Sequence, residues 1–217
     1  RRFGSRWAYV RIDLQVEPGE RVLIFGANGS GKTTLLRTLA TVIRPTRGEL
    51  KIFDQNPLED SEGIRSRLAL LSHHHGFYED LSARDNLRVL ASLCDRSDRS
   101  VELLRGVGLE DRPDAVRNFS AGMRKRLQLA MIQIQSPELI LMDEPFSALD
   151  PAAMDRVGSL IRGLEGTVIL ASHQVQRAAE LCDRAILLDE GQLRWQGPAD
   201  RAWDAWQTLQ IETGVVS

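Results

Sequence analysis

The run from Gly26 to Thr33 has the residue types and spacing of a phosphate-binding loop. Its sequence is Gly26-Ala27-Asn28-Gly29-Ser30-Gly31-Lys32-Thr33, followed by Thr34. Glycines leave room for backbone N–H groups around a phosphate, and the helix that follows adds partial positive charge. Lys32 supplies a point charge for the β- and γ-phosphates, and the Thr33 hydroxyl suits Mg²⁺. The pattern predicts a nucleoside triphosphate site; the alternative is a glycine-rich turn that only caps a helix.

The acid pair Asp143-Glu144 is the second candidate for chemistry. It directly follows the apolar run 139–142. Neighbouring side chains of a strand point to opposite faces, so the two carboxylates meet different surroundings. Asp143 suits the shell of a bound Mg²⁺, and Glu144 can act as the general base that polarises an attacking water. Taken alone, the pair is also compatible with two solvated acids at a strand end.

The elements that must position these residues alternate along the chain. Apolar runs of strand length occur at 22–25, 68–71, 139–142, 167–171 and 185–188. They are continuous, which is typical of strands buried on both faces. A helix is expected after Lys32, with an apolar face formed by Leu35, Leu36, Leu39 and Val42. Another is expected over 123–135. Strands that alternate with helices predict a parallel α/β sheet.

Two segments predict antiparallel pairing instead. Turns at 47–49 and 189–192 lead into the strands expected at 50–53 and 193–196. The pattern between Ser72 and Pro137 is almost wholly helical, which indicates a helical insertion.

The expected fold class is therefore α/β, with a P-loop NTPase core. This core has a largely parallel sheet with helices on both faces, a small antiparallel β part and an inserted helical subdomain. We expect one domain over 1–217, with the core at 1–72 and 138–217 and the helical subdomain at 73–137.

Three further motifs follow in a fixed order. They are Asn118-Phe119-Ser120-Ala121-Gly122-Met123, then Pro145-Phe146-Ser147-Ala148-Leu149-Asp150, then Ser172-His173. With the phosphate loop and the acid pair, they resemble the nucleotide-binding subunit of ATP-binding cassette (ABC) transporters over nearly the whole chain. That family has, in order, a phosphate loop, a Gln loop, an L-S-G-G-Q signature, D-E-P, S-x-L-D and a switch histidine.

The resemblance implies roles for single residues. Phe3 corresponds to the aromatic that stacks on adenine, unless it is a core or edge residue. His173 corresponds to the switch histidine that contacts the γ-phosphate and positions Glu144 and water. The expected catalytic residues are thus Lys32, Glu144 and His173, and the expected metal ligands are Thr33 and Asp143. The expected nucleotide-binding residues are Phe3, Gly26, Asn28, Gly29, Ser30, Gly31, Lys32, Thr33, Thr34, His73, Ser120, Ala121, Gly122 and Asp150.

The resemblance also implies a partner chain. Ser120, Ala121 and Gly122 lie in the signature, which contacts the γ-phosphate bound to the opposite protomer. Ser120 has the position of an N-cap, and the helix that begins there directs its dipole at an anion. Asp150 matches the acid that communicates across the dimer. The implied assembly is a homodimer, or a pair of ATPase subunits, closed around two ATP and Mg²⁺ and attached to integral membrane permease subunits.

Some positions depart from the family pattern. His73 replaces the glutamine of the Gln loop, and imidazole is a poorer partner for Mg²⁺ than an amide oxygen. A transition-metal site in histidines 73–75 is the sharper alternative, but consecutive loop residues do not converge on a metal without other ligands. Ala121 and Met123 make the signature loose. These departures concern the rate of hydrolysis rather than the fold.

The segment 76–87 lies where the family docks a short helix of its membrane subunit. Its Phe77-Tyr78 pair suits such a contact, or else packs within the helical subdomain. Trp203 and Trp206 are three residues apart on an expected helix, and we expect them to cover the core.

The transported compound is less well defined. The compact size, the histidine in the Gln loop and the Ser-Ala-Gly signature are similar to the haem exporter of cytochrome c maturation. The run 123–126 is closer to general exporters of drugs, lipids or polysaccharides. A soluble ABC ATPase that acts on DNA or ribosomes and a binding-only subunit are further alternatives. Glu144 and His173 speak against the binding-only alternative.

The composition, the net charge and the cysteine content bear on the partners and the location of the chain. The chain has 217 residues, 42 % of them hydrophobic, and a formal net charge of −2, which gives no electrostatic footprint for nucleic acid. Its two cysteines, Cys94 and Cys182, are far apart, as in proteins of a reducing compartment. No apolar run approaches the ~18 residues that span a bilayer. We expect a peripheral subunit at the cytoplasmic face of the inner (cell) membrane, with no nucleic-acid partner.

Overall fold

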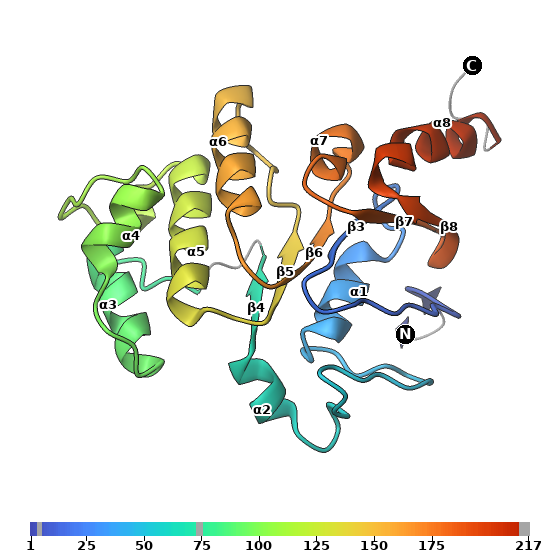
Figure 1. The fold of residues 1–217 in the computed structure, drawn as a ribbon, viewed down its shortest axis with the longest axis horizontal. Coiled ribbons are helices and arrows are strands. Elements are labelled where there is room, and N and C mark those ends of the chain that lie inside the picture. Colours follow the sequence, from blue (N-terminus) through green and yellow to red (C-terminus); the bar gives the residue numbers. More distant parts are fainter. Residues whose placement is uncertain (4–5, 73–75, 213–217) are drawn as a thin grey trace.

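The computed structural model describes residues 1–3, 6–72 and 76–212 (Figure 1). In these residues six strands form one sheet in the order β4-β5-β6-β3-β7-β8. The bounds are β3 Arg21–Phe25, β4 Leu68–Leu71, β5 Leu139–Asp143, β6 Thr167–Ala171, β7 Arg184–Asp189 and β8 Gln192–Pro198. All neighbouring pairs are parallel except β7–β8, which is antiparallel. The expected parallel sheet is confirmed, and so is the antiparallel strand at its edge.

Helices cover both faces of the sheet. Their bounds are α1 Lys32–Leu39, α2 Ser61–Ser66, α3 Ala83–Leu93, α4 Ser100–Gly106, α5 Ala121–Gln135, α6 Pro151–Arg162, α7 Val175–Ala179 and α8 Ala202–Glu212. Alternate residues of β3 belong to different core clusters: Val22 and Ile24 pack with α1 and α2, and Leu23 and Phe25 pack with α6, α7 and α8. This is the arrangement that a strand buried on both faces requires.

A third hydrophobic cluster lies in the helices between β4 and β5. It joins α3, α4 and α5 through buried leucines such as Leu87, Leu104 and Leu127. Phe77 packs against this cluster, whereas Tyr78 is exposed. Figure 1 shows these helices beside α6, at the opposite end of the molecule from α8 and the N-terminus. The expected helical insertion is present, and only one residue of its aromatic pair faces solvent.

The prediction of an antiparallel strand at 50–53 is wrong. Only an isolated bridge forms there, in which Ile52 and Gln55 exchange backbone hydrogen bonds of 2.9 and 3.0 Å. Phe53 and Asp54 both have positive φ, at 54° and 60°, which is the backbone of a type I′ turn. The chain therefore folds back on itself instead of adding a strand. A second, two-stranded antiparallel piece lies at the N-terminus, where β1 (Arg2–Phe3) pairs with β2 (Arg6–Trp7).

The helix that begins at Lys32 is shorter than its apolar spacing predicts. Leu35 and Leu36 are buried on its inner face, but α1 ends at Leu39 and Val42 is 62 % exposed. Thr41 has a left-handed φ of 58° and ends the helical path. Trp206 covers the core as expected, because its ring meets Phe25 edge-on with the centroids 6.3 Å apart, but the same expectation for Trp203 is wrong, since that side chain is exposed.

Candidate functional site

The candidate site lies at the carboxyl ends of three adjacent strands, β5, β6 and β3. The register places Asp143 beside Ala171, and Ala171 beside Ile24. The acid pair after β5, the Ser172-His173 pair after β6 and the loop after β3 therefore meet at one edge of the sheet. Ligands of open parallel sheets bind at this edge. The topology brings the phosphate loop next to two motifs that follow it by more than a hundred residues in the sequence.

The loop between β3 and α1 is built to hold an anion. Gly26 and Ser30 are buried, whereas Asn28 and Gly29 face solvent. α1 has no side-chain cap, so its first N–H groups keep their hydrogen-bonding capacity. The Ser30 hydroxyl is buried and has no partner among the described residues. Gly31 has a φ of +107°, and a Cβ there would lie 2.4 Å from the Ala8 carbonyl oxygen.

Lys32 lies under this loop with only 6 % of its surface exposed. Its Nζ donates to the carbonyl oxygens of Gly26 and Ala27, both at 2.9 Å. Burial lowers the pKa of the Lys32 ammonium, and the charges of Glu144 and Asp143 oppose this shift. A triphosphate would place an anion in direct contact with this ammonium, so these residues fit the phosphates of a nucleotide.

Thr33 and Asp143 lie close together. The Thr33 hydroxyl donates to Asp143 Oδ1 at 3.0 Å, and Asp143 is 4 % exposed. A hydroxyl and a carboxylate are the hard oxygen donors that Mg²⁺ prefers. The pair therefore fits that ion beside the phosphates. Thr34 follows in the first turn of α1 and is half-buried.

Glu144 is held in place by the end of β6. The backbone N–H of His173 donates to its Oε1 at 3.0 Å, and the Ser172 hydroxyl donates to its Oε2 at 3.3 Å. The Nδ1 atom of His173 lies 2.9 Å from Oε2. Glu144 has a left-handed φ of 51°, and backbone strain of this kind clusters at functional sites. The carboxylate is fixed by His173, to which the family resemblance gives this role, and by Ser172, for which the sequence predicts none.

The signature residues belong to a different part of the molecule, where Ser120 and Ala121 are exposed and Gly122 is half-buried. Ser120 accepts a hydrogen bond from the Met123 N–H at 3.3 Å, which confirms it as the N-cap of α5. Ala121 follows it at the surface, and Gly122 packs toward α6 near Ala153. Figure 1 shows α5 beside α3 and α4 in the helical insertion, with β4 and β5 between it and α1. One chain does not bring its own signature to its own phosphate loop.

Three further expected residues have different outcomes. Asp150 is exposed and forms the N-cap of α6, with Oδ1 accepting from the Ala153 N–H at 2.8 Å. Phe3 lies in β1, and Ala8 on the following segment reaches Gly31 of the phosphate loop. Its stacking on adenine stays a prediction. His73 lies outside the described residues, as do its two histidine neighbours.

The sequence matches the family model described as ABC transporter over residues 9–147. The chain belongs to the ABC transporter family. This ABC cassette is 34 % identical to the "Daunorubicin resistance ATP-binding protein DrrA3" of Streptomyces coeruleorubidus, over 99 % of the chain and 68 % of that relative. It is 38 % identical to the "Cytochrome c biogenesis ATP-binding export protein CcmA" of Bordetella bronchiseptica, over 86 % of the chain and 87 % of that relative.

A solved structure has a similar fold. It is the dimeric structure of a post-hydrolysis state of the ATP-binding cassette MJ0796 bound to ADP and phosphate. The TM-score is 0.81 at 24 % identity, over 92 % of this chain and 94 % of that one. The expected family and fold class are confirmed, and the cassette is an ATP-binding ATPase of that family.

Two buried polar residues of α5 were not expected at the site. Gln128 donates to the Ser72 carbonyl oxygen at 3.1 Å, and Lys125 is 4 % exposed. Lys125 belongs to a basic run, which usually marks a solvated helix face. Its helical register with Leu129 and Ile132, both buried, is the signal that places it on the inner face instead.

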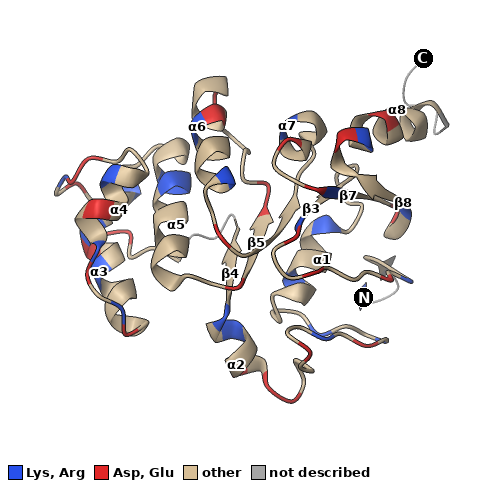
Figure 2. Cartoon of the chain, viewed as in Figure 1, with Lys and Arg blue, Asp and Glu red and all other residues tan. Residues whose placement is uncertain are grey.

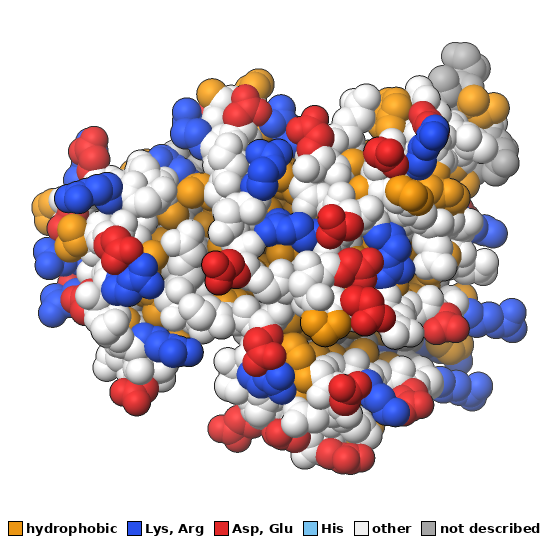
Figure 3. Space-filling view, viewed as in Figure 1, with side chains coloured by type: hydrophobic (Ala, Val, Ile, Leu, Met, Phe, Trp, Pro, Cys, Tyr) orange, Lys and Arg blue, Asp and Glu red, His pale blue; other side chains and the backbone are white. Residues whose placement is uncertain are grey.

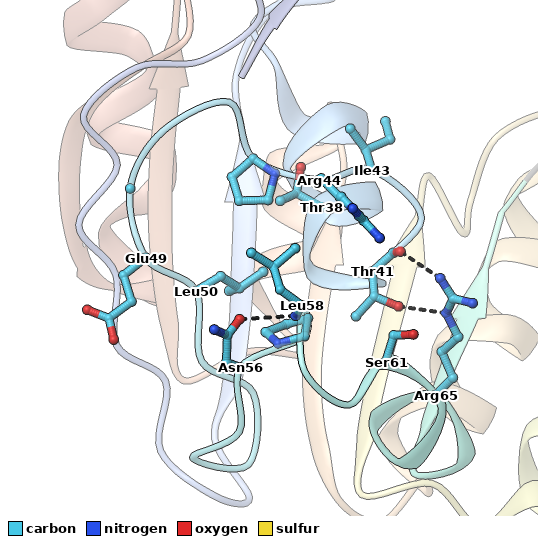
Figure 4. Close-up of a pocket in the computed structure, with 13 residues that line it drawn as sticks. Thr38, Thr41, Ile43, Arg44, Glu49, Leu50, Asn56, Leu58, Ser61 and Arg65 are labelled. Carbon is cyan, nitrogen blue, oxygen red and sulfur yellow. Dashed lines mark hydrogen bonds between the residues drawn. The ribbon is translucent and has the colours of Figure 1, made fainter.

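A cavity of about 170 Å³ lies apart from this site, at the other end of α1 (Figure 4). Thr38, Thr41 and Arg65 line it, and Arg65 is occupied by hydrogen bonds to Thr41 of 2.8 and 2.9 Å. None of the residues with expected roles in nucleotide binding lines this cavity.

Neither positive nor negative side chains predominate on the face of the molecule that is shown. Basic and acidic side chains are interspersed over the helices and across that face (Figures 2 and 3). No helix in the described part of the chain is long and apolar enough to cross a membrane.

Proposed function

We propose that this cassette is the ATP-hydrolysing subunit of an exporter, and that it works as a dimer on separate membrane subunits. The observation that supports this most is the convergence of Lys32, Asp143, Glu144 and His173 at the ends of β3, β5 and β6. These are the groups that phosphoryl transfer to water requires: a cation that binds the phosphates, a metal ligand and a general base.

Each residue has a defined task in that reaction. Lys32 binds the β- and γ-phosphates, for which its two backbone acceptors already hold the ammonium in place. Thr33 and Asp143 hold Mg²⁺, which when bound neutralises developing phosphate charge. Glu144 accepts a proton from the attacking water. His173 orients that carboxylate through its backbone N–H and its ring.

The second protomer completes the site. Ser120 and Gly122 stand at the N-terminus of α5, whose dipole and first N–H groups, apart from the capped one of Met123, favour an anion. In the dimer, Ser120 and Gly122 would contact the γ-phosphate of the ATP that is bound to the opposite chain. The dimeric, ADP- and phosphate-bound structure named above supports this assembly. An isologous pairing of two chains, in which a two-fold axis brings the signature of each chain to the phosphate loop of the other, creates two such sites.

We further propose that the exporter is of the haem type used in cytochrome c biogenesis. The supporting observation is the 38 % identity to the cytochrome c biogenesis relative. Its cassettes would then lie at the cytoplasmic face of the cell membrane, held by permease subunits. The second candidate is a general drug exporter, which the 34 % identity to the daunorubicin resistance protein favours.

Haem staining of c-type cytochromes in the native host separates the two candidates. The host would express the parent, Glu144→Gln, or the surface control Glu165→Gln. Loss of covalently attached haem in Glu144→Gln alone, with the apocytochrome still exported, supports haem export. Normal cytochromes, with the variant cassette present at parental level, contradict it and favour the drug exporter.

A further inference from the structure

Lys125 is a buried cation that the roles above do not use. Only 4 % of its surface is exposed, and its Nζ has no hydrogen-bond partner among the described residues. A lysine is almost never fully buried unless a charge partner compensates for lost hydration. The chain has only three lysines, and the other two are Lys32 of the phosphate loop and the exposed Lys51.

The fold places Lys125 beside the acid pair. Gln128 on the next turn of α5 is fixed to Ser72, the residue directly after β4. β4 pairs with β5 so that Leu71 stands opposite Met142. The end of β4 is therefore level with Asp143. α5 ends at Gln135, just before β5 begins at Leu139, so the start of α5 is directed toward the carboxyl ends of these strands. Lys125 precedes Gln128 by three residues, a rise of about 4.5 Å, and therefore lies further in that direction.

The charges that act on Lys125 are those of the site. Burial lowers the pKa of its ammonium, and the Asp143 and Glu144 carboxylates oppose that shift. The same two acids act on Lys32. The charges of the acid pair therefore act on two lysines, one from the phosphate loop and one from the helical insertion.

The neighbouring arginines of the basic run are occupied elsewhere. Arg124 forms an ion pair with Glu79 at 2.7 Å, and Arg126 donates to backbone carbonyl oxygens, among them Gly108. Both interactions lie within the helical insertion. Lys125 is the member of the run that is directed at the sheet.

We propose that Lys125 is a positioning residue of the ATP site, whose buried ammonium neutralises the acid pair so that ATP can enter before Mg²⁺. The inference rests on the proposed function. Without metal, two carboxylates face an incoming triphosphate, and Lys32 balances only one of them. Lys125 balances the other. Once Mg²⁺ is bound at Asp143, its two charges make the contribution of Lys125 smaller.

The test is binding of a fluorescent ATP analogue to purified protein, in excess EDTA and in excess Mg²⁺. We expect Lys125→Met to weaken binding about tenfold in EDTA and less than about threefold with Mg²⁺. Lys125→Arg keeps the charge and should bind within about threefold of the parent in both conditions. Lys51→Met, at an exposed lysine paired with Glu49, is the matched control and should bind as the parent does.

Three results would overturn the inference. They are an unchanged affinity of Lys125→Met in EDTA, an equal loss in both conditions, and a loss in Lys125→Arg as large as in Lys125→Met. An equal loss together with a lower melting temperature would mean that Lys125 only supports packing. If the parent itself binds no nucleotide in either condition, the proposed function fails, and that outcome differs from all three.

Discussion

Replacing Gly31 by alanine tests how closely the N-terminal segment is seated on the phosphate loop. The new Cβ would lie 2.4 Å from the Ala8 carbonyl oxygen, and φ is +107°. The unfavourable backbone conformation costs about 1–2 kcal/mol, and overpacking against backbone costs about 1–3 kcal/mol. We therefore expect Gly31→Ala to lower the free energy of unfolding by about 2–5 kcal/mol.

Gly29 in the same loop is the matched control. Its φ is +83°, but nothing lies within 4 Å of a Cβ there. Gly29→Ala should cost only the conformational part, about 1–2 kcal/mol. For a chain of this size the melting temperature should fall by about 10 °C for Gly31→Ala and about 4 °C for Gly29→Ala. Calorimetry of both variants measures the difference, and equal melting temperatures would refute the close contact with Ala8.

Three other predictions concern the scaffold of the site. Glu20 and Arg184 form a partly buried pair at 2.6 Å, and we expect Arg184→Leu to cost at most about 1 kcal/mol at neutral pH. Hydrogen bonds from Arg184 lower the pKa of Glu20 below 4.5, so this contribution is present above pH 4.5 and is lost as the pH falls further. Urea unfolding at neutral pH and at about pH 3 checks the sign, and a cost that grows on acidification would contradict it. Asp150→Ala removes the N-cap of α6 and should cost about 1 kcal/mol in urea unfolding, with Asp150→Asn closer to the parent; equal losses would argue against the cap. Phe146 is fully buried, and Phe146→Ala should cost about 3–5 kcal/mol; calorimetry showing less than about 1 kcal/mol would mean that the core is packed differently.

Much of the fold is predictable because the strands are short, continuous apolar runs. All five parallel strands lie within one residue of the expected ranges. The failures come from single backbone positions. Phe53 and Asp54 turn the chain back at 50–53, and Thr41 ends α1 before Val42. Apolar spacing says nothing about a left-handed φ at a non-glycine residue. The order of strands in the sheet depends on contacts between distant segments, which periodicity does not describe.

The candidate site was predictable where its motifs are contiguous. The phosphate loop and the acid pair follow from spacing, and the topology of the sheet then brings them together. Lys125 was missed because it stands between two arginines that face other partners. The contacts that fix Glu144 come from Ser172 and His173 across the β5–β6 edge. Such contacts depend on the register between β5 and β6, which a local sequence pattern does not predict.

The most direct test of the account measures ATP turnover and ATP binding together, in purified parent, Glu144→Gln and Glu165→Gln. The exposed Glu165 lies outside the site. If Glu144 is the general base, its substitution should lower the rate of phosphate release by about 10²–10⁴-fold. Nucleotide binding should stay within about threefold of the parent, since Lys32 and the loop are unchanged. The Glu165→Gln control should hydrolyse ATP as the parent does. Turnover by Glu144→Gln within about tenfold of the parent would contradict the account.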